Sequence, residues 1–423
     1  MKRMALNFIC KNESHIIERM LHSALPITDL IVAVDTGSND HTISIIRTWG
    51  DAHGIPTYVF ERPFDDFANS RNYALDKLIE IVGRLGWNRN ETWGFWFDCD
   101  EVMKFVDDFD KDAISDDLYF VTGISEDMAF SKQLFFALSK PFKWEGPVHE
   151  YMRCESEQLS VSHCNQIIIN YEMKGASWKT DIEKKYLFYV EKLKEYTSQG
   201  HRTYRWLLYL ADSYYAAAIN CKDPVRKKQW HLFAHESYLD VAGLKGMERY
   251  EQCRLYSHIA ANQMDLNETW PLVKESLLKA FKAEKRFAEP IETIIEFYIN
   301  MQQWHIALIC STFAVIQYQG RRPHGPGVAD IKPSLYQWRL LYYHYLILMH
   351  LRRFREAHDV YQLIKHEQSK HPDNFSVKDA EMLYVNAPHF IKYRLKLETV
   401  KNIIKRHLTP ISNTIPRYLT SEV

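Results

Sequence analysis

The alternation of strand-like and helix-like segments over the first hundred residues constrains the fold most strongly. Four short, mostly apolar runs are typical of β-strands, at residues 5–11, 30–38, 56–61 and 93–98. Longer amphipathic segments separate them. Ser14 and Asp40 stand where their side chains can cap the first two helices, and the third helix is expected over residues 70–85. Strands and helices in this order predict an open, mostly parallel α/β sheet.

Acidic and amide side chains stand at the ends of three of these strands. Asn12 and Glu13 come after the first strand, and Asp35 follows the aliphatic run of the second. The fourth, in the segment GFWFDCDEVMKF at residues 94–105, passes from aromatic residues to the carboxylates of residues 98–101. Ligands of open α/β sheets bind beyond the carboxyl ends of the strands. We therefore expect the functional site at this edge.

The spacing of Asp98 and Asp100 suggests a metal-binding pair. Two aspartates one residue apart at a strand end can share one Mg²⁺ or Mn²⁺, and such ions commonly join one or two carboxylates to substrate phosphates. The alternative is a solvated acidic loop, because a pair of aspartates with this spacing is common by chance.

Five segments together resemble the family 2 glycosyltransferases of the GT-A fold, over roughly residues 4–155. They are NFICKNESHIIERML, LIVAVDTGSNDHTISII, FDDFANSRNYAL, GFWFDCDEVM and WEGPVHEYM, in the family's order and at its usual spacings. The resemblance implies a Rossmann-like GT-A domain that transfers a sugar, with inversion, from a nucleotide-sugar donor. A UDP-sugar and a divalent metal, Mn²⁺ or Mg²⁺, are the expected donor and cofactor.

The same resemblance implies roles for individual residues. Asn12, Glu13 and Asp35 would contact the nucleotide base and ribose, and Arg71 would lie near the diphosphate. The donor-binding residues that it implies are Cys10, Asn12, Glu13, Asp35, Gly37, Asp66, Arg71 and Asp98. The implied metal ligands are Asp98, Asp100 and His149, and the implied catalytic residues are Glu150, as the base, and Asp100.

Several of these residues also have a purely structural interpretation. Asp35 could close a turn with Ser38, and Arg71 could be a helix-surface residue paired with Asp66. His149 could be an ordinary loop histidine. The sequence leaves these alternatives open.

The sequence leaves the identity of the base and the contacts to the diphosphate open. Glu145 and Asp65 compete with Glu150 for the role of base, because their geometry cannot be read from the sequence. Relatives often carry arginines in an RLFR segment before the VHE loop, whereas this chain has Gln133 and Phe136 in KQLFFAL.

From about residue 180 the strand signal disappears and an all-α region is expected. Residues 181–196 form an amphipathic pattern, and later segments fit degenerate tetratricopeptide-like repeats of about 34 residues. The positions that carry this pattern are Leu207, Leu210, Ala211 and Tyr214, then Ala234, Tyr238 and Val241 after an insertion near residues 220–230, and Ile291, Ile294, Tyr298, Ala307 and Ala314. Residues 320–333 are expected to form a long loop, and residues 352–364 a second repeat helix. We predict a glycosyltransferase domain over 1–175 and a helical repeat domain over 176–423.

This layout is similar to that of the bacterial enzymes that glycosylate cysteine in peptides. Repeats of this kind offer a concave surface, so a peptide, protein or glycan acceptor, or a homodimer, is expected there. Residues 1–170 hold 16 Lys and Arg against 27 Asp and Glu, and the remainder holds 37 against 27, a net of about −11 and +10. The positive half keeps a nucleic-acid acceptor open.

The cysteines and the lengths of the apolar runs limit the class of protein. The seven cysteines are scattered without a CxxC pair, and no run of about 18 apolar residues occurs, which predicts a cytoplasmic protein without a transmembrane helix. Three functions differ from the leading one: glycosylation of modified DNA or a nucleotide, a non-catalytic nucleotide-sugar-sensing scaffold, and nucleotidyl transfer. The last usually needs a glycine-rich phosphate loop near the first strand, and ICKNES lacks one.

Overall fold

The computed structural model describes residues 2–126, 128–156, 158–172, 174–176, 181–323 and 331–370 of the chain. The chain divides into two compact units. The first comprises Met1–Glu248 with Ala261–Thr269, and the second comprises Arg249–Ala260 and the residues from Trp270 onward. The sheet and the first helices of the α-helical region therefore belong to one unit.

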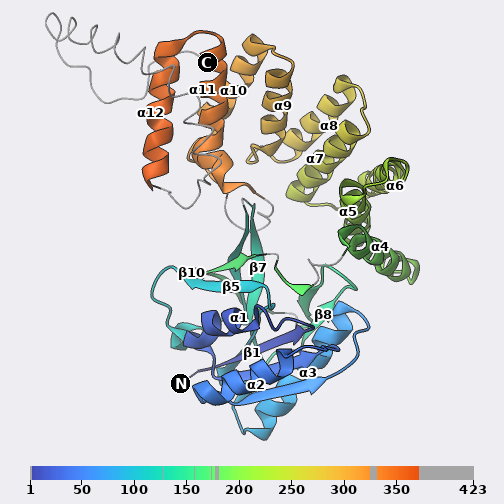
Figure 1. Ribbon diagram of the computed structural model, residues 1–423, viewed down its shortest axis with the longest axis vertical. Helices are drawn as coiled ribbons and strands as arrows, with labels where there is room; N and C mark the ends of the chain where they lie inside the picture. Colours follow the sequence, from blue (N-terminus) through green and yellow to red (C-terminus); the bar gives the residue numbers. More distant parts are fainter. Residues whose placement is uncertain are drawn as a thin grey trace, which may run out of the picture. The chain divides into compact units, whose positions relative to one another are not determined.

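An eight-stranded sheet in the order β3-β2-β1-β4-β7-β6-β10-β5 forms the centre of the first unit (Figure 1). Its strands are β1 Arg3–Cys10, β2 Leu30–Asp35, β3 Thr57–Glu61, β4 Thr92–Trp96, β5 Glu101–Phe105, β6 Leu118–Ser125, β7 Met128–Ala137 and β10 Val161–Tyr171. The first four pair in parallel, as do β6 and β10, whereas β7 is antiparallel to β4 and β6, and β5 is antiparallel to β10. The expected mostly parallel sheet is confirmed.

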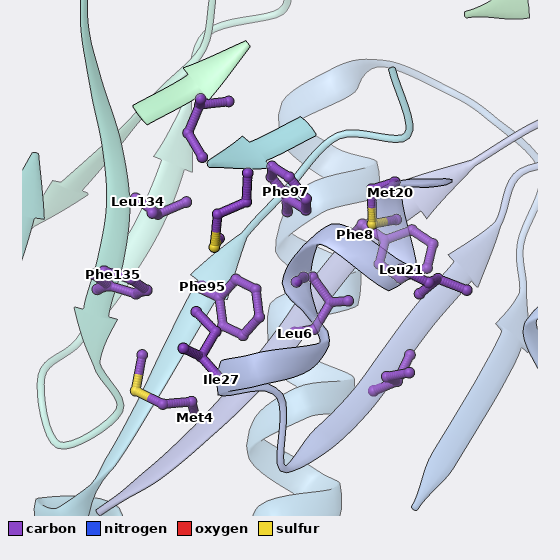
Figure 2. Packing of buried hydrophobic residues seen from close by; sticks show 14 of the residues in the cluster. Met4, Leu6, Phe8, Met20, Leu21, Ile27, Phe95, Phe97, Leu134 and Phe135 are labelled. Carbon is purple, nitrogen blue, oxygen red and sulfur yellow. The ribbon is translucent and has the colours of Figure 1, made fainter. Parts of the chain in front are cut away.

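Helices cover both faces of the sheet. Residues of α1 (Ile17–Ala24) and α2 (Thr42–His53) pack into the core on one face, where Figure 2 shows Leu6 and Phe8 of β1 beside Met20 and Leu21 of α1. On the other face, α3 (Phe67–Arg84) packs with the separate hairpin of β8 (Phe142–Glu145) and β9 (Tyr151–Cys154). Short 3-10 helices occupy Leu25–Ile27, Arg89–Glu91 and Lys111–Ala113. Alternating side chains of β1 enter both cores, which fixes the strand between the two layers.

Ser14 and Asp40 were expected as the N-caps of the first two helices, but the N-cap residues are Ile16 and His41. Ser14 was expected to cap α1, and this is wrong: α1 begins at Ile17, whose backbone N–H donates to the carbonyl of Glu13 at 2.9 Å. The backbone N–H of Ser14 instead donates to Oδ2 of Asp40 at 3.2 Å. The other oxygen of Asp40 accepts from the backbone of Thr42 at 3.0 Å, in the first turn of α2. Asp40 therefore serves both the helix start and the loop beside it.

The rest of the chain is helical where it is described, as expected. The helices are α4 Ile182–Ser198, α5 Tyr204–Asn220, α6 Pro224–Ala242, α7 Arg249–Asp265, α8 Trp270–Ala283, α9 Glu289–Asn300, α10 Trp304–Tyr318, α11 Leu340–His350 and α12 Phe354–Lys370, with a π-helix at Leu335–Arg339. The positions that suggested repeats are buried, except for the half-buried Tyr298.

Three details of the helical region bear on the expectations. The helix predicted over residues 352–364 is confirmed as α12. The insertion near residues 220–230 is mostly helical, because α6 already begins at Pro224. Of the predicted loop at 320–333, residues 324–330 lie outside the described residues. Within the described part of the chain, every helix is too short or too polar to cross a membrane.

A close approach joins α5 to the loop after β8. Gly146 has φ +103°, in the left-handed region that favours glycine, and a Cβ placed there would lie 2.1 Å from Cη2 of Trp206. Arg205 donates from Nη2 to the backbone carbonyl of His149 at 3.1 Å. Helix α5 is thus bonded directly to the loop that carries the predicted base.

Candidate functional site

The carboxylate of Asp98 is the centre of a network of charged side chains just beyond β4. Its Oδ1 accepts a hydrogen bond from Nε1 of Trp96 at 2.8 Å and lies 3.3 Å from Nη2 of Arg71. Its Oδ2 lies 3.8 Å from Nζ of Lys132. The backbone N–H of Asp98 donates to Oε2 of Glu101 at 2.9 Å. Two cations therefore face the first aspartate of the predicted pair.

Arg71 of α3 joins Asp98 to the predicted base. Its Nη2 lies 2.6 Å from Oε1 of Glu150 as well as 3.3 Å from Asp98. The guanidinium lies over the rings of Trp96 and Trp144, 4.6 and 4.8 Å from their centroids. Side-chain exposures of 13% for Arg71 and 7% for Glu150 show that this ion pair is largely removed from water.

Asp66, which the resemblance places at the donor pocket, begins α3. Its Oδ1 accepts from the backbone N–H of Asn69 at 2.7 Å, the contact of an N-cap. Arg71 makes its ion pairs with Asp98 and Glu150 rather than with Asp66. The surface-pair interpretation of Arg71 is therefore wrong.

Burial and the neighbouring charges shift the pKa values of the three carboxyl groups of the network in different directions. Burial alone would raise the pKa of Asp98, but Arg71 and Lys132 together hold it below its usual value. Burial raises the pKa of Glu150, and Arg71 offsets only part of that rise. Burial also raises the pKa of Glu101 to about 7 in spite of Lys132. Asp98 is thus the carboxylate that stays ionised most readily, whereas the pKa values of Glu150 and Glu101 are both raised.

Lys132 was not singled out from the sequence, and Glu101 was noted only as one of the carboxylates of residues 98–101. They form an ion pair with each other, and the Glu101 side chain is fully buried. The available signal was a lysine at the start of the apolar run KQLFFAL. Gln133, which stands where the family that the sequence resembles often carries an arginine, donates to the carbonyl of Met152 at 3.0 Å and accepts from its N–H at 2.8 Å. The cation of this strand therefore comes from Lys132, one residue earlier.

The loops after β1 and β2 are bonded to each other. Oδ2 of Asp35 accepts from the backbone N–H groups of Gly37 at 2.9 Å and Ser38 at 2.8 Å, so the turn that was considered as an alternative is formed. The Ser38 hydroxyl accepts from the N–H of Asn12 at 2.8 Å, and the Asn12 side chain accepts from the N–H of Asn39 at 2.8 Å. Gly37 has φ +108°. Most of the residues expected at the nucleotide lie in this pair of loops.

Two further residues that were predicted to bind the donor, Cys10 and Glu13, contact other parts of the chain. Cys10 is 4% exposed, and its thiol lies 3.7 Å from Oδ1 of Asp35. Both carboxylate oxygens of Glu13 accept from the backbone N–H of Ala176, at 3.0 and 3.1 Å. The side chain of Cys10 supports the loop of Asp35, and that of Glu13 holds the segment after β10.

The three predicted metal ligands differ in their surroundings. The ring of His149 stacks on Tyr209 of α5, with centroids 4.2 Å apart and planes at 9°. Asp98 already faces two cations. Among the described residues, no group of three or more His, Cys, Asp or Glu side chains is placed to hold a metal ion. An ion held by one carboxylate and by substrate phosphates would need only one of these three side chains.

The rival candidates for the base are paired at the surface. Asp65 lies 2.7 Å from Nη2 of Arg62, and Glu145 lies 3.1 Å from Nη1 of Arg153. Their side chains are 43% and 27% exposed, against 7% for Glu150. Of the three, Glu150 alone makes an ion pair with the Asp98 network.

Comparisons with known proteins give weak likenesses. No family model matches the chain, and no curated protein matches it. A solved structure of S. aureus TarS residues 1–349 in complex with UDP is 11% identical, with 66% of this chain and 88% of that chain covered and a TM-score of 0.33. A tetratricopeptide protein of Thermus thermophilus is 19% identical, with 33% and 71% covered and a TM-score of 0.27. The assembly chaperone of RpL4 is 14% identical, with 53% and 94% covered and a TM-score of 0.27. Scores of this size carry no argument about activity.

Proposed function

We propose that this chain is a glycosyltransferase that moves a sugar from a nucleotide-sugar donor to an acceptor. The convergence of Arg71, Asp98 and Glu150 carries the proposal. These residues come from three of the segments that resemble the family, and each is separated from the next by at least 27 residues. A solvated acidic loop would not need one arginine to face both the buried carboxylate of Glu150 and the half-buried carboxylate of Asp98.

The cations of the network suit a departing nucleoside diphosphate. Charge that develops on the leaving group is stabilised when positive groups are already in place, because a preorganised site pays no reorganisation cost during the reaction. Arg71 and Lys132 would supply this charge, and Asp98 would orient both. A Mn²⁺ or Mg²⁺ ion held by Asp100, with the phosphates as its other ligands, would add electrostatic stabilisation of the same kind.

Glu150 would act as the general base. The bond between the anomeric carbon and the phosphate oxygen breaks, and its electron pair leaves with the nucleoside diphosphate. The acceptor's nucleophilic atom forms the new bond from the opposite side, which inverts the anomeric centre, and its proton passes to Glu150. Burial raises the pKa of Glu150, so it is a stronger base than an exposed glutamate.

The proposal extends to the donor, the acceptor and the division of the chain into domains. A UDP-sugar is the proposed donor, and a peptide, protein or glycan the proposed acceptor, bound by the helical region. The division into a glycosyltransferase domain over 1–175 and a helical domain over 176–423, and a homodimer through the latter, belong to the same proposal.

A donor panel tests the proposal. UDP-, GDP-, dTDP- and CMP-sugars are incubated with the protein, with Mn²⁺ or with EDTA, and thermal stability and sugar release are measured. We expect one donor to be hydrolysed slowly and to raise the melting temperature, since a ligand at 100 times its dissociation constant stabilises by about 2.7 kcal/mol.

The matched variants are D98N/D100N and D107N/D108N. Asp107 and Asp108 are an exposed acidic pair in the next loop, so their replacement should leave the response unchanged. If the panel gives no response, or if D98N/D100N responds as the wild type does, the proposal fails.

A further inference from the structure

Helix α4 presents two side chains to the site from the same face. Lys185 and Tyr189 are four residues apart, which places them side by side on a helix. The ammonium of Lys185 lies 5.9 Å from the centroid of the Tyr189 ring. Because α4 belongs to the same compact unit as the sheet, these side chains can be placed against it.

Tyr189 fixes the position of this face. Its ring contacts His149 edge-on, with centroids 5.7 Å apart, and Phe67 edge-on, with centroids 6.2 Å apart. His149 precedes the proposed base, and Phe67 is the first residue of α3, which carries Arg71. Burial raises the pKa of Tyr189, and the charge of Glu150 adds to the rise. Tyr189 therefore lies among the elements that build the network.

Lys185 lies near the second aspartate of the pair. Burial lowers the pKa of Lys185 to about 8, and the nearby charge of Asp100 offsets part of that change. By contrast, its neighbour Lys184 has a side chain that is 83% exposed. Of two adjacent lysines, Lys185 is thus partly buried, whereas Lys184 is exposed to water.

A donor diphosphate would add negative charge to a network whose two cations already face carboxylates. Arg71 contacts the carboxylates of Asp98 and Glu150, and Lys132 contacts Glu101 and Asp98. Both cations thus face two carboxylates each before any donor binds. A diphosphate brings further negative charge to the same place, and a lysine ammonium is a common partner for phosphate oxygens.

We propose that Lys185 binds the diphosphate of the donor, so that the first helix of the helical region completes the donor site. This rests on the proposed function. Lys185 is then a residue of substrate binding, and the helical region contributes to donor recognition as well as to the acceptor.

Calorimetry with nucleoside diphosphates and their nucleosides tests the assignment. UDP, GDP and dTDP, together with uridine, guanosine and thymidine, are titrated into the full chain and into K185M, K185R and K184M. For the diphosphate that binds, K185M should weaken affinity about 10- to 100-fold, the range for a hydrogen bond to a charged group. Binding of the nucleoside should be unchanged, K184M should match the wild type, and K185R should recover part of the loss.

The outcomes separate the two proposals. If the wild type binds a diphosphate and K185M binds it equally well, the assignment of Lys185 is overturned while the proposed function stands. If K185M weakens the diphosphate and the nucleoside alike, Lys185 supports the fold of the site and the assignment is again overturned. If the wild type binds none of the diphosphates, the proposed function itself fails.

Discussion

Nη2 of Arg71 and Oε1 of Glu150 lie 2.6 Å apart, in a setting where both side chains are more than four-fifths buried. The pair links α3 to the loop before β9, two elements separated by more than 70 residues in the chain. A buried ion pair holds its partners firmly, because either charge alone would be costly. The arrangement therefore holds the proposed base and the proposed diphosphate-binding cation at a fixed separation.

Replacement of Arg71 should lower the stability of the protein. R71M leaves Glu150 without its ion-pair partner and Asp98 with Lys132 as its remaining cation, so we expect a loss of about 3 kcal/mol in the free energy of unfolding. Urea unfolding measures it. R84M, at the exposed end of α3 where the arginine side chain is 67% exposed, should change it by no more than about 0.5 kcal/mol. Equal effects of the two variants would contradict the buried pair.

Replacement of the proposed base should slow transfer without loss of donor binding. E150Q keeps the shape of the side chain and removes its proton acceptor, so we expect transfer to fall about 10²- to 10⁴-fold. The matched variants are E145Q and D65N, whose parent residues are paired at the surface. The initial rate of transfer is measured for each variant with a saturating donor. Glu150 is not the base if either control loses more activity than E150Q.

The turn after β2 should depend on a glycine. G37A forces an alanine to φ +108°, and we expect a loss of about 1–2 kcal/mol together with weaker donor binding. A Cβ at Gly37 would meet one atom, Nζ of Lys11, at 4.0 Å, so the cost is conformational rather than steric. G83A, within α3 and with no atom near its Cβ, should stabilise by about 0.5–1 kcal/mol. Thermal melts with and without donor compare the two, and a neutral G37A would show that the turn relaxes.

A buried histidine in the second unit should make stability depend on pH. Burial lowers the pKa of His344 to about 4, with a further contribution from the charge of Arg353. The unfolded chain binds a proton below about pH 6.5 and the folded chain below about pH 4, so up to about 3 kcal/mol of stability is lost as the pH falls between these values. Urea midpoints at pH 7.5 and pH 5.0 should differ less for H344Q than for the wild type.

The control for this prediction is H305Q. His305 is exposed on α10, so the variant should keep the pH dependence of the wild type. If H344Q also keeps it, the loss at low pH arises from other groups.

The parallel half of the sheet could be predicted because its strands are continuous apolar runs. Leu30–Asp35 is buried at every position, which is the pattern of a strand covered on both faces. Strands β5–β10 were not placed. Residues 161–171, for example, mix exposed polar and buried aliphatic positions around an irregularity in their pairing with β6, so no simple period marks the strand.

The candidate site could be predicted in part. Asp98 and Arg71 were found through their motifs, but the contact between Lys132 and Asp98 joins residues 34 positions apart and leaves no local pattern. The stacking of His149 on Tyr209 is equally invisible, because it depends on how α5 packs against the loop. Local spacing reveals which residue types are present, whereas pairing across the fold depends on packing that one sequence does not display.

The contact between Gly146 and Trp206 has a practical consequence for protein engineering. A chimera that joins this sheet to another protein's helices at residue 175 would discard Trp206 and expose the surface that it covers. Grafted helices would have to place an aromatic ring at the same position to restore the packing contact that supports the VHE loop. Swaps of the helical repeats are therefore better made beyond α6, so that the recipient keeps the helices that form one unit with the sheet.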